Sequence, residues 1–179
     1  MTENEQVRLI LMAKAQDRDS VEALLRQLQT PLHNYISGIV GLTAAADVLQ
    51  ETLVQIWRDL KWLREPELIR PWSYRIASRC SFKWLKRERR FIQADNEVFP
   101  IGDMPAPDRS DLQLFTNTYE FLQVLSPASR GVLVLHYLHE HSLEEVAAIL
   151  EISPGTAKSR LAYGLSRLRD FINRKGVTQ

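Results

Sequence analysis

Apolar residues recur at helical spacing along most of the 179-residue chain. Between positions 21 and 40 they stand three or four residues apart, at Val21, Leu24, Leu25, Leu28, Leu32 and Ile36. This spacing predicts a helix that is broken or restarted at Pro31, and a second helix from Thr43. Pro71 opens a further predicted helix over 71–90, because a proline at the first helical position loses no hydrogen bond. No alternating pattern long enough for a sheet occurs, so we expect an all-α fold.

The helical pattern stops after residue 92. The stretch FIQADNEVFPIGDMPAPDRSD (91–111) contains three prolines, a glycine and five acids, a composition typical of a linker. Helical periodicity then returns in LQLFTNTYEFLQVL and ASRGVLVLHYL. We therefore predict two small helical domains, over 1–92 and 113–179, joined by a flexible linker over 93–112.

Two short helices are predicted close together in SLEEVAAILEISPGTAKSRLAYGLSRLR, near the C-terminus. Ser142 and Glu145 have the spacing of a capping box, in which each side chain bonds a backbone N–H at a helix start. Ser153 and Pro154 provide a second cap and a second first position. The tight turn between them predicts a helix-turn-helix.

The second of these helices has two distinct faces. Its predicted apolar face consists of Ala157, Leu161, Gly164, Leu165, Leu168 and Ile172. The opposite side carries cations flanking small polar groups: Lys158, Arg160, Arg167 and Arg169, with Thr156, Ser159 and Tyr163 between them. Such a face suits a DNA-reading helix, in which polar groups at the N-terminal end reach bases and cations hold phosphates. A solvated helix hairpin would show the same pattern, and capping and spacing alone leave both interpretations open.

The helix predicted over 71–90 carries a basic stripe with aromatic neighbours. The stripe consists of Arg75, Arg79, Lys83, Lys86 and Arg90, with Trp72 and Phe82 near its edges. Cations hold phosphates, and an aromatic face can stack on an unpaired base for about 1 to 3 kcal/mol. The alternative is that Trp72, Tyr74, Phe82 and Trp84 belong to the core. Together with the helix-turn-helix, the stripe suggests DNA that is melted in one place and duplex in another.

The charge distribution supports a nucleic-acid partner. The formal net charge is only +1, yet residues 71–90 carry 7 basic and 1 acidic groups, against 5 and 8 in residues 1–60. A local basic stripe on a near-neutral chain favours a polyanion held at defined places. The single cysteine, Cys80, excludes an internal disulfide and a CxxC pair. With neither a signal peptide nor an apolar run of membrane-spanning length, we expect a soluble, cytoplasmic protein with no membrane insertion.

Few residues suggest chemistry of the chain's own. His136, His139 and His141 could share a metal, but no fourth ligand accompanies them. No nucleophile elbow and no glycine-rich phosphate loop occurs in the sequence. We therefore expect no metal, no cofactor and no enzymatic activity.

Three ordered segments resemble one known family. AADVLQETLVQIWRDL, then PWSYRIASRCSFKWLKRERR, then LSPASRGVLVLHYLHEHSLEEVAAILEISPGTAKSRLAYGLSRLR are similar, in order and spacing, to the extracytoplasmic-function sigma factors of bacteria. The resemblance implies a stress-response subunit of RNA polymerase. Its first domain would bind the polymerase clamp and melt the minus-10 element, and its second would read the minus-35 element. It also implies three partners: core RNA polymerase, promoter DNA and an anti-sigma factor.

The resemblance assigns residues to three surfaces. Asp47, Gln50 and Glu51 match the polymerase-binding motif of the family. The minus-10 surface would comprise Trp72, Arg75, Arg79, Lys83, Lys86, Arg87 and Arg90. The minus-35 surface would comprise Ser153, Gly155, Thr156, Lys158, Ser159, Arg160, Tyr163 and Arg167. The chain departs from the usual pattern at Arg79, where relatives commonly have Asn, at Lys83, where they have Asp, and at Ser73, where they have Leu.

Two other functions compete with this interpretation. A free-standing regulator could use the same helix-turn-helix on an operator, but it would need neither the DVLQE motif nor the aromatic and basic helix. A helical adaptor without a nucleic-acid role would leave the charged stripes solvated, and high salt would then barely change partner binding.

Overall fold

The computed structural model describes residues 2–88 and 122–175. The predicted linker, both domain boundaries and Arg90 lie outside these ranges. Within them every regular element is helical and no strand occurs, which confirms the predicted all-α fold. None of the helices in the described ranges is both long enough and apolar enough to cross a membrane.

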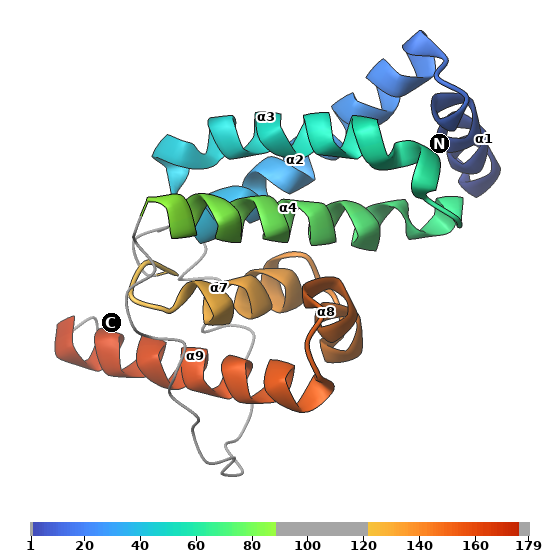
Figure 1. Cartoon of the computed structure of the whole chain (residues 1–179). Coiled ribbons are helices and arrows are strands. Elements are labelled where there is room, and N and C mark those ends of the chain that lie inside the picture. The colour runs from blue at the N-terminus through green and yellow to red at the C-terminus, as the bar shows by residue number, and fades with distance from the viewer. Residues whose placement is uncertain (1, 89–121, 176–179) are drawn as a thin grey trace.

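The first domain is built on three long helices. They are α2 (Arg18–Val40), α3 (Leu42–Asp59) and α4 (Ile69–Arg87), preceded by α1 (Glu3–Lys14). Two short 3-10 turns, η1 (Leu60–Trp62) and η2 (Pro66–Leu68), connect α3 to α4. The helices α2, α3 and α4 pack against one another in every pairing, and α1 packs on α2 (Figure 1).

Local chemistry sets the ends of these helices. Thr2 and Glu5 form a capping box that starts α1, and the Asp17 carboxylate accepts the backbone N–H of Ser20 at the start of α2. Gly41 separates α2 from α3 with a φ of 87°, a conformation that other residues rarely adopt. The sharp turn there lets α3 fold back along α2.

The break expected at Pro31 is wrong, because α2 continues through it. Proline has no N–H to donate to the preceding turn, which normally disfavours a helix interior. Here Leu28 and Leu32, on either side of the proline, are buried in the core. We infer that burial of this face of α2 outweighs the lost hydrogen bond.

The second domain contains the predicted helix-turn-helix. Its elements are α7 (Pro127–Leu133), the π-helical turn η3 (Val134–Leu138), α8 (Leu143–Leu150) and α9 (Pro154–Lys175). The capping box of Ser142 and Glu145 starts α8 as predicted, and Glu151 closes it with a φ of 56°. Gly164 of α9 lies so close to Leu133 that an added Cβ would stand 2.6 Å from its Cδ1, which explains the glycine.

The two domains pack directly on each other and share one apolar core. The helices α7 and α8 lie between the first domain and α9 in Figure 1. Gly38 of α2 faces Val134, where an added Cβ would stand 2.8 Å from Cγ2. The buried guanidinium of Arg130 donates to the backbone carbonyl of Ile39 across the same contact. The sequence did not predict this close packing.

Candidate nucleic-acid interface

Four cations line one side of α4 at intervals of four residues. We call Arg75, Arg79, Lys83 and Arg87 the α4 stripe; their side chains are between 38% and 64% exposed. Lys86 is also exposed on this helix, beside the stripe. The structure therefore brings together the described cations that the sequence assigned to the minus-10 surface.

A glutamate of the first domain holds the C-terminal half of the α4 stripe. Glu51 of α3 accepts Lys83 Nζ at 3.0 Å and Arg87 Nη2 at 3.3 Å. Asp47 and Gln50, the other two residues of the predicted polymerase-binding set, are exposed on α3. The set is thus divided, because Glu51 faces α4 while its two companions face solvent.

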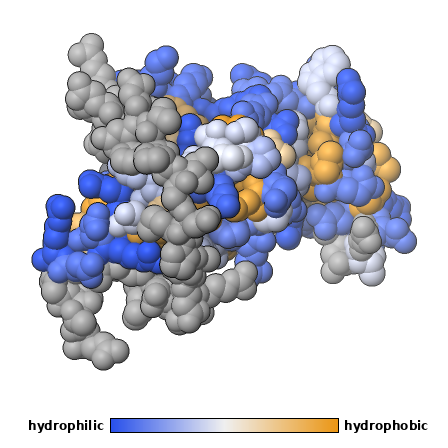
Figure 2. All heavy atoms as spheres, turned by 90° about the horizontal axis from the view of Figure 1, so that it is seen from below, coloured by the Kyte–Doolittle hydropathy of each residue, from blue (hydrophilic) through white to orange (hydrophobic). Residues whose placement is uncertain are grey.

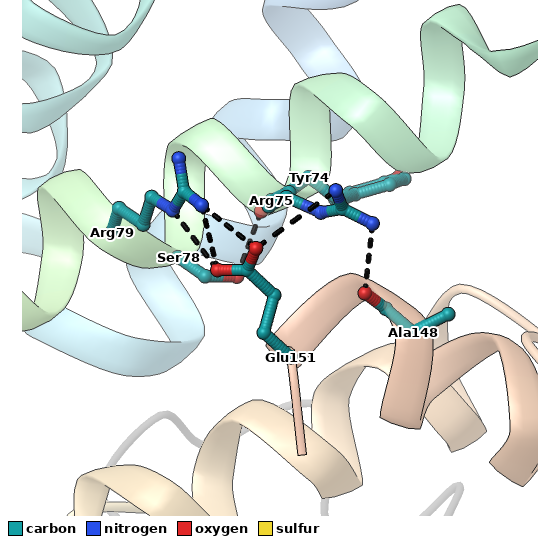
Figure 3. A network of polar contacts seen from close by, with 6 residues as sticks. All are labelled: Tyr74, Arg75, Ser78, Arg79, Ala148 and Glu151. Atoms are coloured by element: carbon teal, nitrogen blue, oxygen red, sulfur yellow. Dashed lines mark hydrogen bonds and ion pairs between the residues drawn. The ribbon is translucent and has the colours of Figure 1, made fainter.

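A glutamate of the second domain holds the N-terminal half (Figure 3). The Arg79 guanidinium donates to both carboxylate oxygens of Glu151, with its Nη2 2.7 Å and 2.8 Å from them. Arg75 Nη1 lies 3.9 Å from the same carboxylate, and Arg75 Nη2 donates to the Ala148 carbonyl at 2.9 Å. The hydrogen bond from Arg79 is the main cause that lowers the pKa of Glu151. The left-handed backbone of Glu151 places this side chain beyond the end of α8.

A buried polar cluster lies under these ion pairs. The Tyr74 hydroxyl is 2.7 Å from His139 Nδ1, and Ser78 Oγ is 2.6 Å from the Tyr35 hydroxyl. Burial lowers the pKa of His139 to about 4, with the charge of His141 adding to the effect. Burial likewise raises the pKa of Tyr74 to about 12. At neutral pH the cluster is therefore uncharged.

Most aromatic residues of α4 are structural. Tyr74 is buried, and Trp72, Phe82 and Trp84 are partly buried against the core. Trp72, which the sequence placed on the minus-10 surface, therefore has only part of its ring available. These positions favour the interpretation that the aromatic residues of α4 belong to the core, rather than the interpretation that they stack on unpaired bases.

The most exposed indole lies in a segment for which the sequence pattern predicted no function. Trp62 in η1 is 72% exposed, and Lys61 Nζ stands 5.2 Å from its ring centre. It falls between Leu60 and Leu63, which are both buried. A bulky aromatic residue out of phase with two core leucines was the signal available in the sequence.

An apolar groove of about 500 Å³ runs between α2 and α3. We call it the α2–α3 groove; its lining includes Leu25, Leu49, Gln50, Val54 and Trp57. Val54 and Trp57 are 41% and 45% exposed. Gln50 belongs to the predicted polymerase-binding set, so the groove adjoins that set on the surface of α3.

The helix α9 carries the predicted minus-35 residues on a face away from the first domain. Ser153 caps α9, its Oγ accepting the Thr156 N–H at 3.0 Å and lying 2.8 Å from Thr156 Oγ1. Ser159 Oγ donates to the Thr156 carbonyl. The exposed members of the set are Ser153, Gly155, Lys158 and Arg167, whereas Thr156, Ser159, Arg160 and Tyr163 are partly buried.

The opposite face of α9 confirms the predicted amphipathic pattern. Ala157, Leu161, Leu165 and Leu168 are buried against the rest of the second domain, and so is Gly164. The side chain of Ile172, which was predicted for the same face, lies outside the described part of the chain. Seen from the α9 side, the molecular surface is mostly hydrophilic with separate hydrophobic patches (Figure 2). On the polar face of α9, Lys158 and Arg167 are exposed.

The three histidines considered as metal ligands have other partners. His136 Nδ1 lies 2.7 Å from the His141 carbonyl, His139 bonds Tyr74, and His141 Nδ1 is 3.7 Å from Glu145. Over residues 2–88 and 122–175, no group of three or more His, Cys, Asp or Glu side chains is arranged to hold a metal ion.

Comparison with known proteins identifies both halves of the chain. The model of Sigma-70 region 2 matches residues 24–91, and that of Sigma-70 region 4 matches residues 121–170. The RNA polymerase sigma-E factor of Streptomyces avermitilis is 31% identical over 135 residues, which cover 74% of this chain and 73% of that protein. The ECF RNA polymerase sigma factor SigL of Mycobacterium tuberculosis is 28% identical over 181 residues, covering 93% and 97%. The chain belongs to the extracytoplasmic-function sigma factors.

Solved structures show the same fold as this sigma factor. CnrH, in complex with the cytosolic domain of CnrY, matches with a TM-score of 0.66 and 23% identity, over 94% of this chain and 97% of that one. The sigma factor RpoE of Bartonella quintana, in complex with the anti-sigma factor NepR, matches with a TM-score of 0.63 and 23% identity, over 85% and 96%. The DVLQE motif, the basic helix and the helix-turn-helix predicted the family and the fold, and the comparisons confirm both predictions.

Proposed function

We propose that this sigma factor binds core RNA polymerase through α3, contacts the melted minus-10 element through the α4 stripe, and reads the minus-35 element through α9. The observation that carries the proposal is the presence of two separate basic faces, on α4 and α9, in a chain that matches regions 2 and 4 in order. Acting on the polymerase places the chain in the cytoplasm and leaves the chemistry of transcription to the polymerase.

The polymerase contact is supported by the surface of α3. Asp47 and Gln50 are exposed there, and the adjoining α2–α3 groove offers apolar area that includes the side of Trp57. Exposed apolar patches with a polar rim mark protein interaction sites. An interface that combines Asp47, Gln50 and the groove would join charge complementarity to the burial of an aromatic anchor.

The minus-10 contact combines the α4 stripe with Trp62. The guanidinium groups can bind phosphates through paired N–H donors. Trp62 lies in the connection that leads into α4, and its exposed ring can stack on an unpaired base. This assigns stacking to a residue outside α4, in agreement with the partial burial of Trp72.

The minus-35 contact uses the N-terminal part of α9. Thr156 and Ser159 make local hydrogen bonds in the free chain, so we expect Arg160 to provide more of the base discrimination than the hydroxyl groups do. Lys158 and Arg167 are exposed and suit phosphate contacts.

An anti-sigma factor is a further proposed partner. CnrH was solved with the cytosolic domain of CnrY, and the RpoE of Bartonella quintana was solved with the anti-sigma factor NepR. The α2–α3 groove and the exposed part of α3 would be covered by an inhibitor that competes with the polymerase. Affinity purification of the chain from unstressed cells should yield such a protein in stoichiometric amount, and recovery of polymerase alone would contradict it.

Gel filtration with core polymerase followed by run-off transcription tests the proposed function. We expect co-elution with core polymerase and transcripts from a subset of genomic fragments of the host bacterium. A free-standing regulator would instead bind duplex fragments without joining the polymerase. Absence of a complex with core polymerase under low and moderate salt would reject the sigma-factor assignment and favour that alternative.

A further inference from the structure

Every cation of the α4 stripe is paired with a carboxylate of the same chain. Glu51 forms ion pairs with Lys83 and Arg87. Glu151 forms an ion pair with Arg79 and a longer one with Arg75. The two glutamates come from different parts of the molecule, one from α3 and the other from the second domain. The surface that would hold the minus-10 strand is therefore already occupied by intramolecular anions.

The pairing with Glu151 uses the donors that a phosphate would use. Arg79 donates to Glu151 Oε2 through Nε at 3.2 Å and through Nη2 at 2.7 Å, and Nη2 also lies 2.8 Å from Oε1. The Nε and Nη2 edge of a guanidinium is also an edge that binds phosphate through paired N–H donors. One guanidinium edge cannot serve both anions at once. DNA phosphates and Glu151 must therefore compete for this edge of Arg79.

The packing of the second domain places Glu151 at the stripe. Val134 packs against Gly38, Arg130 donates to the carbonyl of Ile39, and Tyr74 bonds His139, all across the contact between the domains. Exposed ion pairs contribute little stability by themselves. The buried contacts hold the domains together. Because the domains are held in this arrangement, Glu151 lies within ion-pair distance of Arg75 and Arg79.

We propose that the free sigma factor masks its own minus-10 surface, with Glu151 and Glu51 standing in for DNA phosphates on the α4 stripe. This inference rests on the proposed role of α4. The N–H donors of Arg75 and Arg79 that bond the Ala148 carbonyl and Glu151 become available to a single strand when these contacts break, which we expect when the second domain moves off α4.

The mask gives a physical role to both departures from the family pattern in the stripe. Arg79 and Lys83 stand at the two positions of the stripe where the family resemblance led us to expect Asn and Asp. An Asn at 79 could not form a charged fork with Glu151, and an Asp at 83 would repel Glu51. The two unusual cations are therefore complementary to the two acids that cover them.

Glu51 also connects the mask to polymerase binding. It belongs to the predicted polymerase-binding set, and its carboxylate is held by Lys83 and Arg87 in the free chain. Basic groups of the polymerase that bind Glu51 would release these two cations toward DNA. The C-terminal half of the stripe would thus become available when the polymerase is bound.

The direct test measures binding of a short fluorescein-labelled oligodeoxythymidylate to the full chain by fluorescence anisotropy at low salt. Glu151→Gln should bind the strand about two- to fivefold more tightly than wild type, the range expected for loss of a competing exposed ion pair. Glu144→Gln is the matched control, because Glu144 is an exposed acid of α8 that forms no ion pair within the described part of the chain. An equal gain in Glu144→Gln, or no gain in Glu151→Gln, would overturn the proposal.

Two further variants show whether the gain comes from the α4 stripe. In an Arg79→Ala background Glu151→Gln should give little or no gain, and an undiminished gain would assign the effect to general charge and reject the mask. Gly38→Ala should weaken the domain contact, because the added methyl group would meet Val134. Gly38→Ala should also tighten strand binding. In the double variant with Glu151→Gln, the gain in binding free energy should be smaller than the sum of the two single gains. Fully additive gains would contradict a mask that depends on domain closure.

This test is separable from that of the proposed function. If wild type forms an active holoenzyme but Glu151→Gln binds the strand like wild type, the mask is wrong and the sigma-factor role stands. If Glu151→Gln shows the expected gain but no holoenzyme forms, the mask holds for a DNA-binding protein of another class.

Discussion

The hydroxyl of Tyr74 lies 2.7 Å from Nδ1 of His139, and this hydrogen bond links α4 to the end of η3 across the contact between the two domains. The two ring centres are 4.9 Å apart, and the ring of Tyr35 also lies nearly perpendicular to that of His139, with the ring centres 5.9 Å apart. Burial lowers the pKa of His139 to about 4, below the ordinary value of 6.5. The domain contact is therefore built around a histidine that is neutral at physiological pH.

Acid should consequently weaken the closed fold. In the unfolded chain His139 takes up a proton near pH 6.5, whereas in the folded chain it does so only near pH 4, so the free energy of unfolding falls as pH drops between these values. The expected loss is about 2 kcal/mol between roughly pH 7.5 and pH 5. Burial also lowers the pKa of His141, so His141 contributes to the same loss.

Urea unfolding at the two pH values measures this effect. His139→Gln should keep a polar side chain near Tyr74 while removing most of the pH dependence of the unfolding free energy. The pH dependence that remains should be the contribution of His141. Glu145 and Arg70 interact with His141 and remain in the variant, so they do not account for a difference from wild type. Equal pH slopes for variant and wild type would show that His139 titrates normally.

The parts of the molecule predicted from the sequence are those determined within one segment. The capping box of Ser142 and Glu145 and the apolar face of α9 depend on neighbours three to seven residues away, so their spacing identified them. The pair of Arg79 and Glu151 joins residues 72 positions apart. A charge pattern along α4 shows that its cations need anions, but not which acid of another domain supplies them.

Predictions also failed where packing overrides a local rule. Pro31 has the local chemistry of a helix break, yet the burial of Leu28 and Leu32 keeps α2 intact. Trp62 was missed because its phase relative to Leu60 and Leu63 indicates exposure only once both leucines are known to be buried, and tertiary packing determines that burial. Both cases depend on which face the core covers, and that is a property of the tertiary structure.

Charge reversal on α3 should weaken polymerase binding without unfolding the chain. Asp47 is exposed, so Asp47→Arg creates neither a cavity nor a buried charge. We expect roughly tenfold weaker affinity for core polymerase, from loss of an attractive charge and gain of a repulsive one. Glu67→Arg makes the same change at an exposed site in η2 and should leave the affinity unchanged in the same titration. Wild-type affinity in Asp47→Arg would remove this face from the interface.

The two exposed tryptophans of the first domain should have separate roles. Trp62→Ala should impair promoter opening by about 1 to 3 kcal/mol, the worth of one base stacked on an aromatic ring, and should keep full affinity for core polymerase. Trp57→Ala should weaken binding to core polymerase and leave promoter opening by the assembled holoenzyme unchanged, because Trp57 lines the α2–α3 groove beside Gln50. Each variant is the control for the other in both assays. The assignment fails if both variants lose the same activity.

Arg79→Ala and Lys83→Ala should reduce opening of promoter DNA more than they reduce duplex binding. Both cations lie on α4, whereas duplex binding at the minus-35 element is assigned to α9. Permanganate reactivity of the melted region measures opening in the mutant holoenzyme, and a minus-35 duplex measures the other step. If reactivity in both variants equals that of wild type, these residues do not contact the melted strand.

Arginines at two positions of α9 should behave differently toward DNA. Arg160 is partly buried in the N-terminal half, whereas Arg167 is exposed two turns further along. In a recognition helix the N-terminal turns face the bases, and cations further along meet phosphates. Arg160→Ala should therefore cost about 1 to 3 kcal/mol and relax preference at one base pair, because it removes a base contact. Arg167→Ala should weaken all sequences alike and lower the salt slope by about one, because it removes a phosphate contact.

Binding of both variants to a set of minus-35 sequences at several salt concentrations separates the two effects. Arg174→Ala is the matched control, since Arg174 is exposed near the far end of α9 and should change neither the base preference nor the salt slope. A solvated helix hairpin without a DNA role predicts the same profile for all three variants and for wild type. That result would remove α9 from promoter recognition, whereas a change in preference confined to Arg160→Ala is the result expected from a base contact by this arginine.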